Sequence, residues 1–180
     1  MKKALIILLA VCMLWAAVGC TALGGANAPT EPERKTFLVP GYNLQIMADE
    51  TYSEKTGGSF DLQLTNNSTY ISVMAYNYSD LDEGTTARDL YDFHNEDITS
   101  KRDAVNTVEE TYTFTLPQAE VIHGVFTAEK EGNKNYYASY LFDFPEKETV
   151  AWVLVTAIPS YYENNKEHLN NMACSLAPIE

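Results

Sequence analysis

After residue 20, the most apolar run of the sequence is residues 150–155, which read Val-Ala-Trp-Val-Leu-Val. A strand with one face in water alternates apolar and polar residues, whereas this run has no polar position, as in strands buried on both faces. Residues 70–78 show the same property, because apolar or aromatic side chains occupy both of their faces. The sequence therefore predicts a sheet that is covered on both sides.

Shorter alternating segments supply the remaining predicted strands. Residues 36–47 suggest two strands around the turn Pro40-Gly41, a further short strand starts near Tyr52, and residues 59–65 form a hairpin with residues 70–78. Three more strands are predicted in the second half, at residues 112–116, 121–129 and 136–144. The connections between these strands are short, so the sheet should be mainly antiparallel.

Two amphipathic helices are predicted. In residues 87–100 apolar side chains recur at helical spacing, and Thr86 with Asp89 has the spacing of a capping box. The second helix is predicted at residues 160–176, with a Ser160–Glu163 capping box and Pro178 as its stop. Its apolar stripe consists of Leu169, Met172, Ala173 and Leu176.

These elements predict an α+β fold in which a mainly antiparallel sheet is covered by helices on both faces, an α/β/α sandwich. The alternatives are a cystatin-like sheet with one helix and a small lipocalin-like barrel. We expect a single globular domain at residues 36–180, because no internal repeat or second domain is visible.

The first twenty residues have the proportions of a secretory signal. Lys2 and Lys3 precede an apolar run at residues 4–18, which is shorter than the roughly 20 residues of a membrane span. The ending Gly19-Cys20 resembles the lipobox of bacterial lipoproteins, although Ala17 stands where that family most often has leucine. The resemblance implies a signal peptide at residues 1–19, cleaved after Gly19, and an acyl (palmitate-type) lipid on Cys20.

A lipid on Cys20 would hold the protein at the bacterial cell membrane, with its domain on the extracytoplasmic side. Residues 20–35 then form a tether rich in Gly, Pro and Ala, with a reach of roughly 20 Å. Without Cys12 and Cys20, only Cys174 remains, so no disulfide is expected within the domain.

The net charge limits the possible partners. The whole chain carries −13, and removal of the leader with its two lysines leaves ten basic and 25 acidic residues, or −15. Nucleic acid and anionic lipid headgroups both require a basic surface, so neither is expected as a partner. The acidic residues are interpreted as a solubilising surface, and the alternative is that they attract a cationic partner.

No catalytic, metal or cofactor motif is present, so the chain is not expected to be an enzyme. His94, His123 and His168 are isolated and are interpreted as structural. The acidic residues after Asp80 do not fit a calcium loop, because Tyr91 stands where the bidentate glutamate would be needed.

Aromatic residues give the one candidate recognition surface. Of twelve tyrosines, five gather late in the sequence: Tyr136, Tyr137, Tyr140, Tyr161 and Tyr162. Amphipathic aromatic side chains are common in sites that recognise proteins or glycans. The alternative is that they fill half-buried sheet positions, for which tyrosine is well suited.

Two segments carry a further resemblance. The first is the opening Phe-Leu-Val-Pro-Gly-Tyr of residues 37–42, and the second is the apolar strand at residues 150–157 followed by Tyr162, Leu169, Met172 and Ser175-Leu176. Together they are similar to the fold shared by PsbP, an extrinsic protein of photosystem II, and the Ran nucleotide-release factor. The resemblance implies a PsbP-like fold over residues 36–178 and transfers no functional residue.

The function expected from the sequence is a tethered, non-catalytic recognition or assembly module of the cell envelope, with a protein or envelope glycan as partner. The alternatives are an envelope enzyme with an unrecognised site and a carrier of a small apolar ligand.

Overall fold

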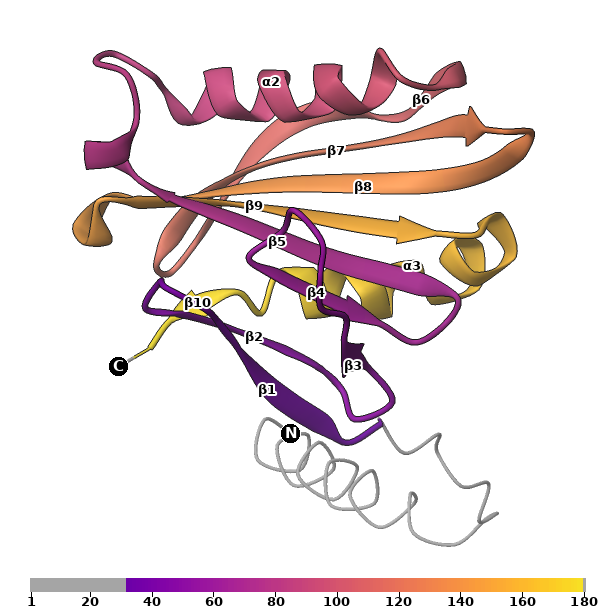
Figure 1. Ribbon diagram of the computed structural model, residues 1–180, viewed down its shortest axis with the longest axis horizontal. Coiled ribbons are helices and arrows are strands. Elements are labelled where there is room, and N and C mark those ends of the chain that lie inside the picture. Colours follow the sequence, from indigo (N-terminus) through magenta and orange to yellow (C-terminus); the bar gives the residue numbers. More distant parts are fainter. Residues whose placement is uncertain (1–31, 180) are drawn as a thin grey trace, which may run out of the picture. The chain divides into compact units, whose positions relative to one another are not determined.

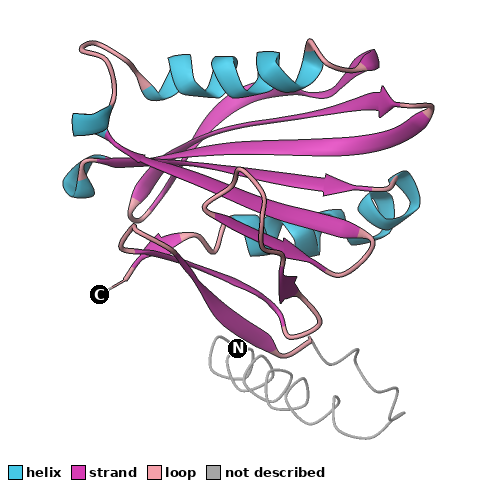
Figure 2. Ribbon diagram, viewed as in Figure 1, coloured by secondary structure: helices cyan, strands magenta, loops and turns pink. Residues whose placement is uncertain are grey.

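A computed structural model describes residues 32–179 of the chain. The expected signal peptide, the cleavage after Gly19, the lipid on Cys20 and nearly all of the tether lie outside the described residues. In the described part, the strands form two antiparallel sheets accompanied by two α-helices (Figures 1 and 2). No helix within residues 32–179 is both long and apolar enough to span a bilayer.

The larger sheet of the described chain has seven strands. In spatial order they are β3 (Ser53–Glu54), β4 (Leu62–Thr65), β5 (Thr69–Asn77), β9 (Thr149–Ala157), β8 (Asn133–Phe144), β7 (Ala119–Lys130) and β6 (Asp103–Leu116). The smaller sheet has the order β1 (Arg34–Val39), β2 (Leu44–Asp49) and β10 (Ala177–Pro178). The helices are α2 (Ala87–Thr99) and α3 (Pro159–Ala173), and short 3-10 turns lie at η1 (Tyr78–Asp80) and η2 (Pro145–Lys147).

Strand β9 lies at the centre of the larger sheet, between β5 and β8. All its residues except Thr156 are buried, which confirms the prediction that both of its faces are covered. Alternate residues enter two separate cores: Trp152 and Leu154 pack in one, and Val153 and Val155 in the other. The period of two residues in a strand divides a single apolar run between two cores.

Each core contains one helix. Leu90 and Tyr91 of α2 belong to the core that holds Trp152, whereas Leu169 and Met172 of α3 belong to the core that holds Val153. The second core is also closed by the smaller sheet, whose Phe37, Ile46 and other apolar residues are buried in it. The α+β class with a mainly antiparallel sheet is thus confirmed. The separate three-stranded sheet was not predicted, because alternation does not reveal a strand's neighbour.

The helix ends agree with the sequence at α2 and differ at α3. Thr86 and Asp89 form the predicted capping box, with reciprocal hydrogen bonds of 3.2 and 2.9 Å. The predicted box of Ser160 and Glu163 is wrong, because α3 begins at Pro159 and its N-cap is Ile158, which makes no side-chain cap. Proline suits the first helical position, since its φ is already helical and its missing N–H has no helical partner there.

The C-terminal end of α3 was also predicted too late. The helix ends at Ala173, and Pro178 lies in β10, where it is paired with Leu44. The pairing of β10 with β2 brings the end of the described chain back to its first strands (Figure 1).

Candidate functional site

A groove of about 800 Å³ runs beside α2, on the face of the larger sheet that carries Trp152. It exists because α2 packs mainly over β7 and β8 and its His94 reaches only the near part of the same face of β5 and β9, so that most of that face has no helix over it (Figure 1). Lys55 and Phe60, from the segment between β3 and β4, form part of its wall. The groove therefore lies between this segment and α2, with sheet residues between them.

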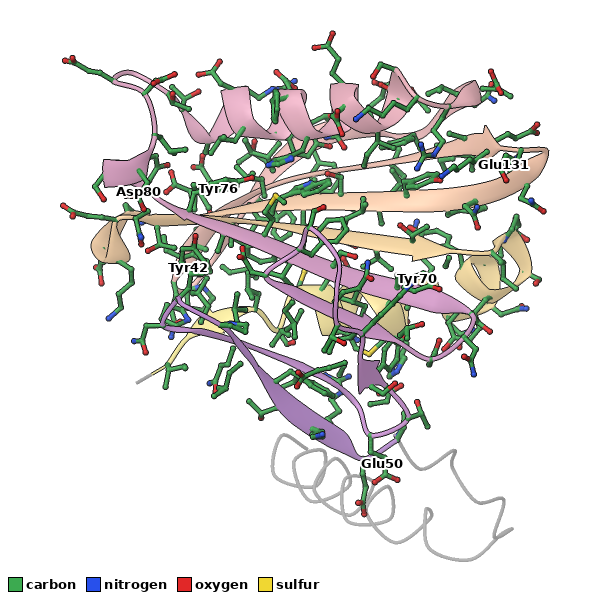
Figure 3. The ribbon with its side chains drawn as sticks, in the orientation of Figure 1. Tyr42, Glu50, Tyr70, Tyr76, Asp80 and Glu131 are labelled. Carbon is green, nitrogen blue, oxygen red and sulfur yellow. The ribbon has the colours of Figure 1, made fainter. Side chains whose placement is uncertain are left out.

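Strand register sets the order of residues along the groove. Tyr70 is paired with Thr156, and Thr156 with Tyr137, which gives one row across three strands. Further along β5, Met74 is paired with Trp152. Tyr70 and Tyr76 lie towards opposite ends of β5 (Figure 3), and at about 3.3 Å per residue the six steps between them span about 20 Å.

One end of the groove, called here the aromatic end, is built around Trp152. The imidazole of His94 stacks on the indole, with ring centroids 4.2 Å apart and planes 6° from parallel. The Phe60 ring lies beside the same indole, tilted to it, with the ring centroids 6.3 Å apart. The indole N–H donates a 2.8 Å hydrogen bond to Ser139. The Trp152 ring is therefore fixed by two neighbouring rings and one hydrogen bond.

His94 and Tyr76, at the aromatic end, are both neutral at pH 7. Burial lowers the pKa of His94 to about 4, and burial, reinforced by the carboxylate of Asp61, raises the pKa of Tyr76 to about 12. The Tyr76 hydroxyl lies 3.0 Å from His94 Nε2 and donates to Met74 Sδ at 2.8 Å. An effective general base has a pKa near the working pH, so this pair is better suited to contact than to proton transfer.

The other end, called here the cationic end, collects basic side chains around the row of Tyr70 and Tyr137. The four that line the groove are Lys55, Lys101, Arg102 and Lys130. Lys55 Nζ lies 5.0 Å from the centre of the Tyr70 ring, and Arg102 Nε donates to the Tyr137 hydroxyl at 3.3 Å. Lys101 forms an ion pair with Asp97, one helical turn earlier. No carboxylate within residues 32–179 forms an ion pair with Lys55 or Lys130.

The charge of the groove is opposite to that of the chain as a whole. Residues 32–179 contain ten lysines and arginines and 23 acidic residues, but the groove is lined by four basic residues and one acidic residue, Asp97. Glu129 precedes Lys130 on β7 and points to the opposite face of the strand. Glu131 lies at the tip of the β7–β8 turn (Figure 3) and does not line the groove. The groove is thus a local cationic site on an acidic protein.

The five tyrosines singled out in the sequence do not form one exposed patch. Tyr137, Tyr140 and Tyr162 are buried, and Tyr136 and Tyr161 are half-buried. Tyr137 lies in the core with Trp152, whereas Tyr140 and Tyr162 lie in the core with Val153. Side chains alternate along β8, so Tyr137 points away from Tyr136 and Tyr140.

Tyr161 and Tyr162 belong to α3, and Tyr136 of β8 packs against this helix. Tyr136 stacks on Tyr162 at 4.4 Å and donates a 3.0 Å hydrogen bond to Glu163, while the hydroxyl of Tyr161 accepts one from Asn66 at 2.9 Å. Of the five tyrosines, only Tyr137 lines the groove.

The three histidines lie apart from one another. Only His94 lines the groove; His168 Nε2 lies 2.7 Å from Asp49 Oδ2, between α3 and β2. His123 is buried on β7, its Nδ1 is 3.0 Å from the carbonyl of Ser139, and burial lowers its pKa.

The acidic turn after β5 has a local hydrogen-bonding role. Asp80 lies in η1 (labelled in Figure 3) and accepts a 3.0 Å hydrogen bond from the Asn77 side chain. In the described part of the chain, no three His, Cys, Asp or Glu side chains converge as metal ligands.

The groove itself was not predicted from the sequence. Trp152 could have been noticed as the largest side chain of the central apolar run. The cationic end had no sequence signal, because Lys55, Lys101 and Lys130 are far apart in the chain and isolated lysines are ordinary surface residues.

Comparison with known proteins identifies the fold. No protein-family model matches the chain, and no curated protein matches it in sequence. Cyanobacterial PsbP (CyanoP) from Synechocystis is similar in structure, with a TM-score of 0.62 at 8% identity over 88% of this chain and 98% of that one. The Ran-binding protein Mog1p from Saccharomyces cerevisiae is similar with a TM-score of 0.57 at 9% identity, over 83% and 97% of the two chains. The domain therefore has a PsbP-like fold, as the sequence resemblance implied.

Proposed function

We propose that this protein is a membrane-tethered lipoprotein of the bacterial cell envelope that acts as a non-catalytic recognition module and binds its partner in the groove beside α2. The observation that carries the proposal is the composition of the groove: a fixed aromatic end, four basic side chains at the other end, and His94 and Tyr76 neutral at pH 7. Binding sites commonly combine an apolar floor with a few placed polar groups.

The structural neighbours support this role only at the level of fold. Mog1p is named as a Ran-binding protein, so a domain of this fold serves in binding there. At 9% identity no partner or contact residue can be transferred to the present chain.

Site-specific photo-crosslinking tests the recognition role. A photoreactive phenylalanine replaces Phe93, which lines the groove with 63% of its surface exposed, or Leu38, which lies outside the groove on β1 with 59% exposed. In cells that make the protein, we expect a defined crosslinked species from position 93 and none of the same mass from position 38. Equal crosslinking at both positions, or none at 93, would contradict recognition in the groove.

The lipid anchor is tested separately. The change Cys20→Ser should abolish acyl labelling and leave a longer, uncleaved precursor, because the lipidated cysteine defines the cleavage site. Two or three acyl chains hold a protein at a bilayer where one chain is marginal, so attachment of the wild type should resist high salt. Recovery of the wild-type protein in the aqueous phase of a detergent partition would refute the anchor while leaving the groove proposal intact.

A further inference from the structure

We propose that the groove binds an acidic peptide segment that also carries an apolar or aromatic side chain, with its carboxylates at the cationic end and its apolar side chain at the aromatic end. This inference rests on the proposed recognition function and specifies the chemistry of the partner. It depends on three features of the groove: its charge, its two-ended composition and its length.

The charge at the cationic end selects an anion. Lysines and arginines are ten of the 33 charged residues in residues 32–179, but four of the five that line the groove. Lys101 and Arg102 follow the C-terminus of α2, where cations stabilise a helix, so a structural role accounts for them in part. Lys55 and Lys130 come from two other elements. Lys55 lies over the Tyr70 ring, and neither lysine forms an ion pair with a carboxylate within residues 32–179.

The acidic remainder of the protein does not prevent an anion from binding. At physiological ionic strength charges are screened over about 8 Å, so carboxylates elsewhere on the domain act weakly at the groove. The four basic side chains that line the groove act directly on a bound ligand. The excess of acidic residues outside the groove would instead discourage anionic surfaces too large to fit within it, such as a membrane or a nucleic acid.

The aromatic end requires an apolar group on the same ligand. Phe60, Met74 and Phe93 line the groove and are partly or largely exposed, around the buried ring of Trp152. Phe93 is 63% exposed, so its ring is accessible to a ligand in the groove. A purely acidic ligand would leave this apolar surface in water.

The length of the groove favours an extended segment over a small molecule. The floor from Tyr70 to Tyr76 spans about 20 Å, which corresponds to about six extended residues. Such a segment can place carboxylates near Lys55 and Lys130 and, at the same time, an aromatic ring beside Phe60. A single amino acid is too short to reach both ends.

Calorimetric titration of the detergent-solubilised full chain tests the proposal, with the synthetic hexapeptide Glu-Glu-Glu-Trp-Leu-Trp as the probe. We expect saturable binding at least tenfold tighter than that of the glutamine analogue Gln-Gln-Gln-Trp-Leu-Trp, and weaker binding as salt is added. N-acetyltryptophan, a small aromatic anion, should bind at least tenfold more weakly than the hexapeptide. Equal affinity for the glutamine analogue or for N-acetyltryptophan would overturn the inference.

Charge reversal localises the site. The double variant Lys55→Glu with Lys130→Glu should weaken hexapeptide binding about tenfold or more, because two attractions become repulsions. Its matched control, Lys134→Glu with Lys147→Glu, makes the same change in net charge at exposed positions outside the groove and should bind as the wild type does. Equal weakening in both double variants would overturn the inference, since it would reflect net charge alone.

The two proposals can fail independently. Crosslinking at position 93 to a segment without acidic residues would overturn the acidic-peptide inference and leave the recognition function standing. Self-association of the protein through position 93, seen as a crosslinked dimer, would likewise overturn it. Absence of crosslinking together with absence of hexapeptide binding would overturn both.

Discussion

His94 of α2 and Trp152 of β9 lie with their rings parallel and 4.2 Å apart, although 58 positions separate them in the sequence. This stack joins the helix to the central strand and forms the wall of the groove at its aromatic end. The imidazole in this stack is uncharged at pH 7, because burial opposes the cationic form and lowers the pKa of His94 to about 4.

The free energy of unfolding should therefore decrease in acid, because the unfolded chain protonates His94 more readily than the folded domain does. The unfolded chain takes up a proton at this side chain near pH 6.5, and the folded domain only near pH 4. The contribution of neutral His94 to the free energy of unfolding is therefore complete above pH 6.5. It is lost as the pH falls towards 4, and because the side chain is partly solvated the loss is about 2 kcal/mol. Urea unfolding at several pH values measures it. The variant His94→Phe, which keeps a stacked ring and cannot titrate, should lose less stability over this range; an unchanged slope would contradict the assignment.

The two helix starts should respond differently to the loss of a hydroxyl. Thr86→Ala removes the cap that accepts from Asp89 N and should lower the free energy of unfolding by about 1 kcal/mol. Ser160→Ala should change it by less than about 0.5 kcal/mol, because Ser160 is exposed and caps nothing in α3. Denaturant unfolding of the two variants compares them directly. A comparable loss in both would mean that Ser160 caps its helix after all.

Gly124 on β7 has no room for a side chain. A Cβ at this position would lie 2.6 Å from the Tyr91 hydroxyl and 3.0 Å from Thr111 Oγ1. Gly124→Ala should therefore cost about 1–3 kcal/mol through overpacking between β6, β7 and α2. In a Tyr91→Phe background, which removes the closest atom, the same change should cost less. Additive costs in this double-mutant cycle would show that Tyr91 is not the obstacle.

Cys174 should react slowly with thiol reagents in the folded protein. Burial raises the pKa of its thiol above the ordinary value of 9.0, and only the thiolate is nucleophilic. Alkylation at pH 7.5, followed by mass spectrometry of the peptide that contains Cys174, should be at least about tenfold slower in buffer than in denaturant. Equal rates in both conditions would indicate a reactive, accessible thiol.

Local patterns in the sequence determined much of the fold. The apolar run at residues 150–155 identified a central strand covered on both faces, and Thr86 with Asp89 located the start of α2. These features could be predicted because each depends on residues close together in the chain. At α3 two local signals competed: Pro159 and Ser160 could each begin the helix, and the fixed φ of proline prevailed over the serine cap.

Only the tertiary structure decided where the site lies. The sequence placed five late tyrosines together, but strand alternation and helix packing divided them between two cores. The groove exists because α2 packs mainly over β7 and β8 and leaves most of the same face of the adjoining strands uncovered. Lys55, Lys101 and Lys130 meet there through chain folding, since no spacing along the sequence relates them. The sequence by itself determined which residues form strands and helices, and long-range packing decided which of them share a surface.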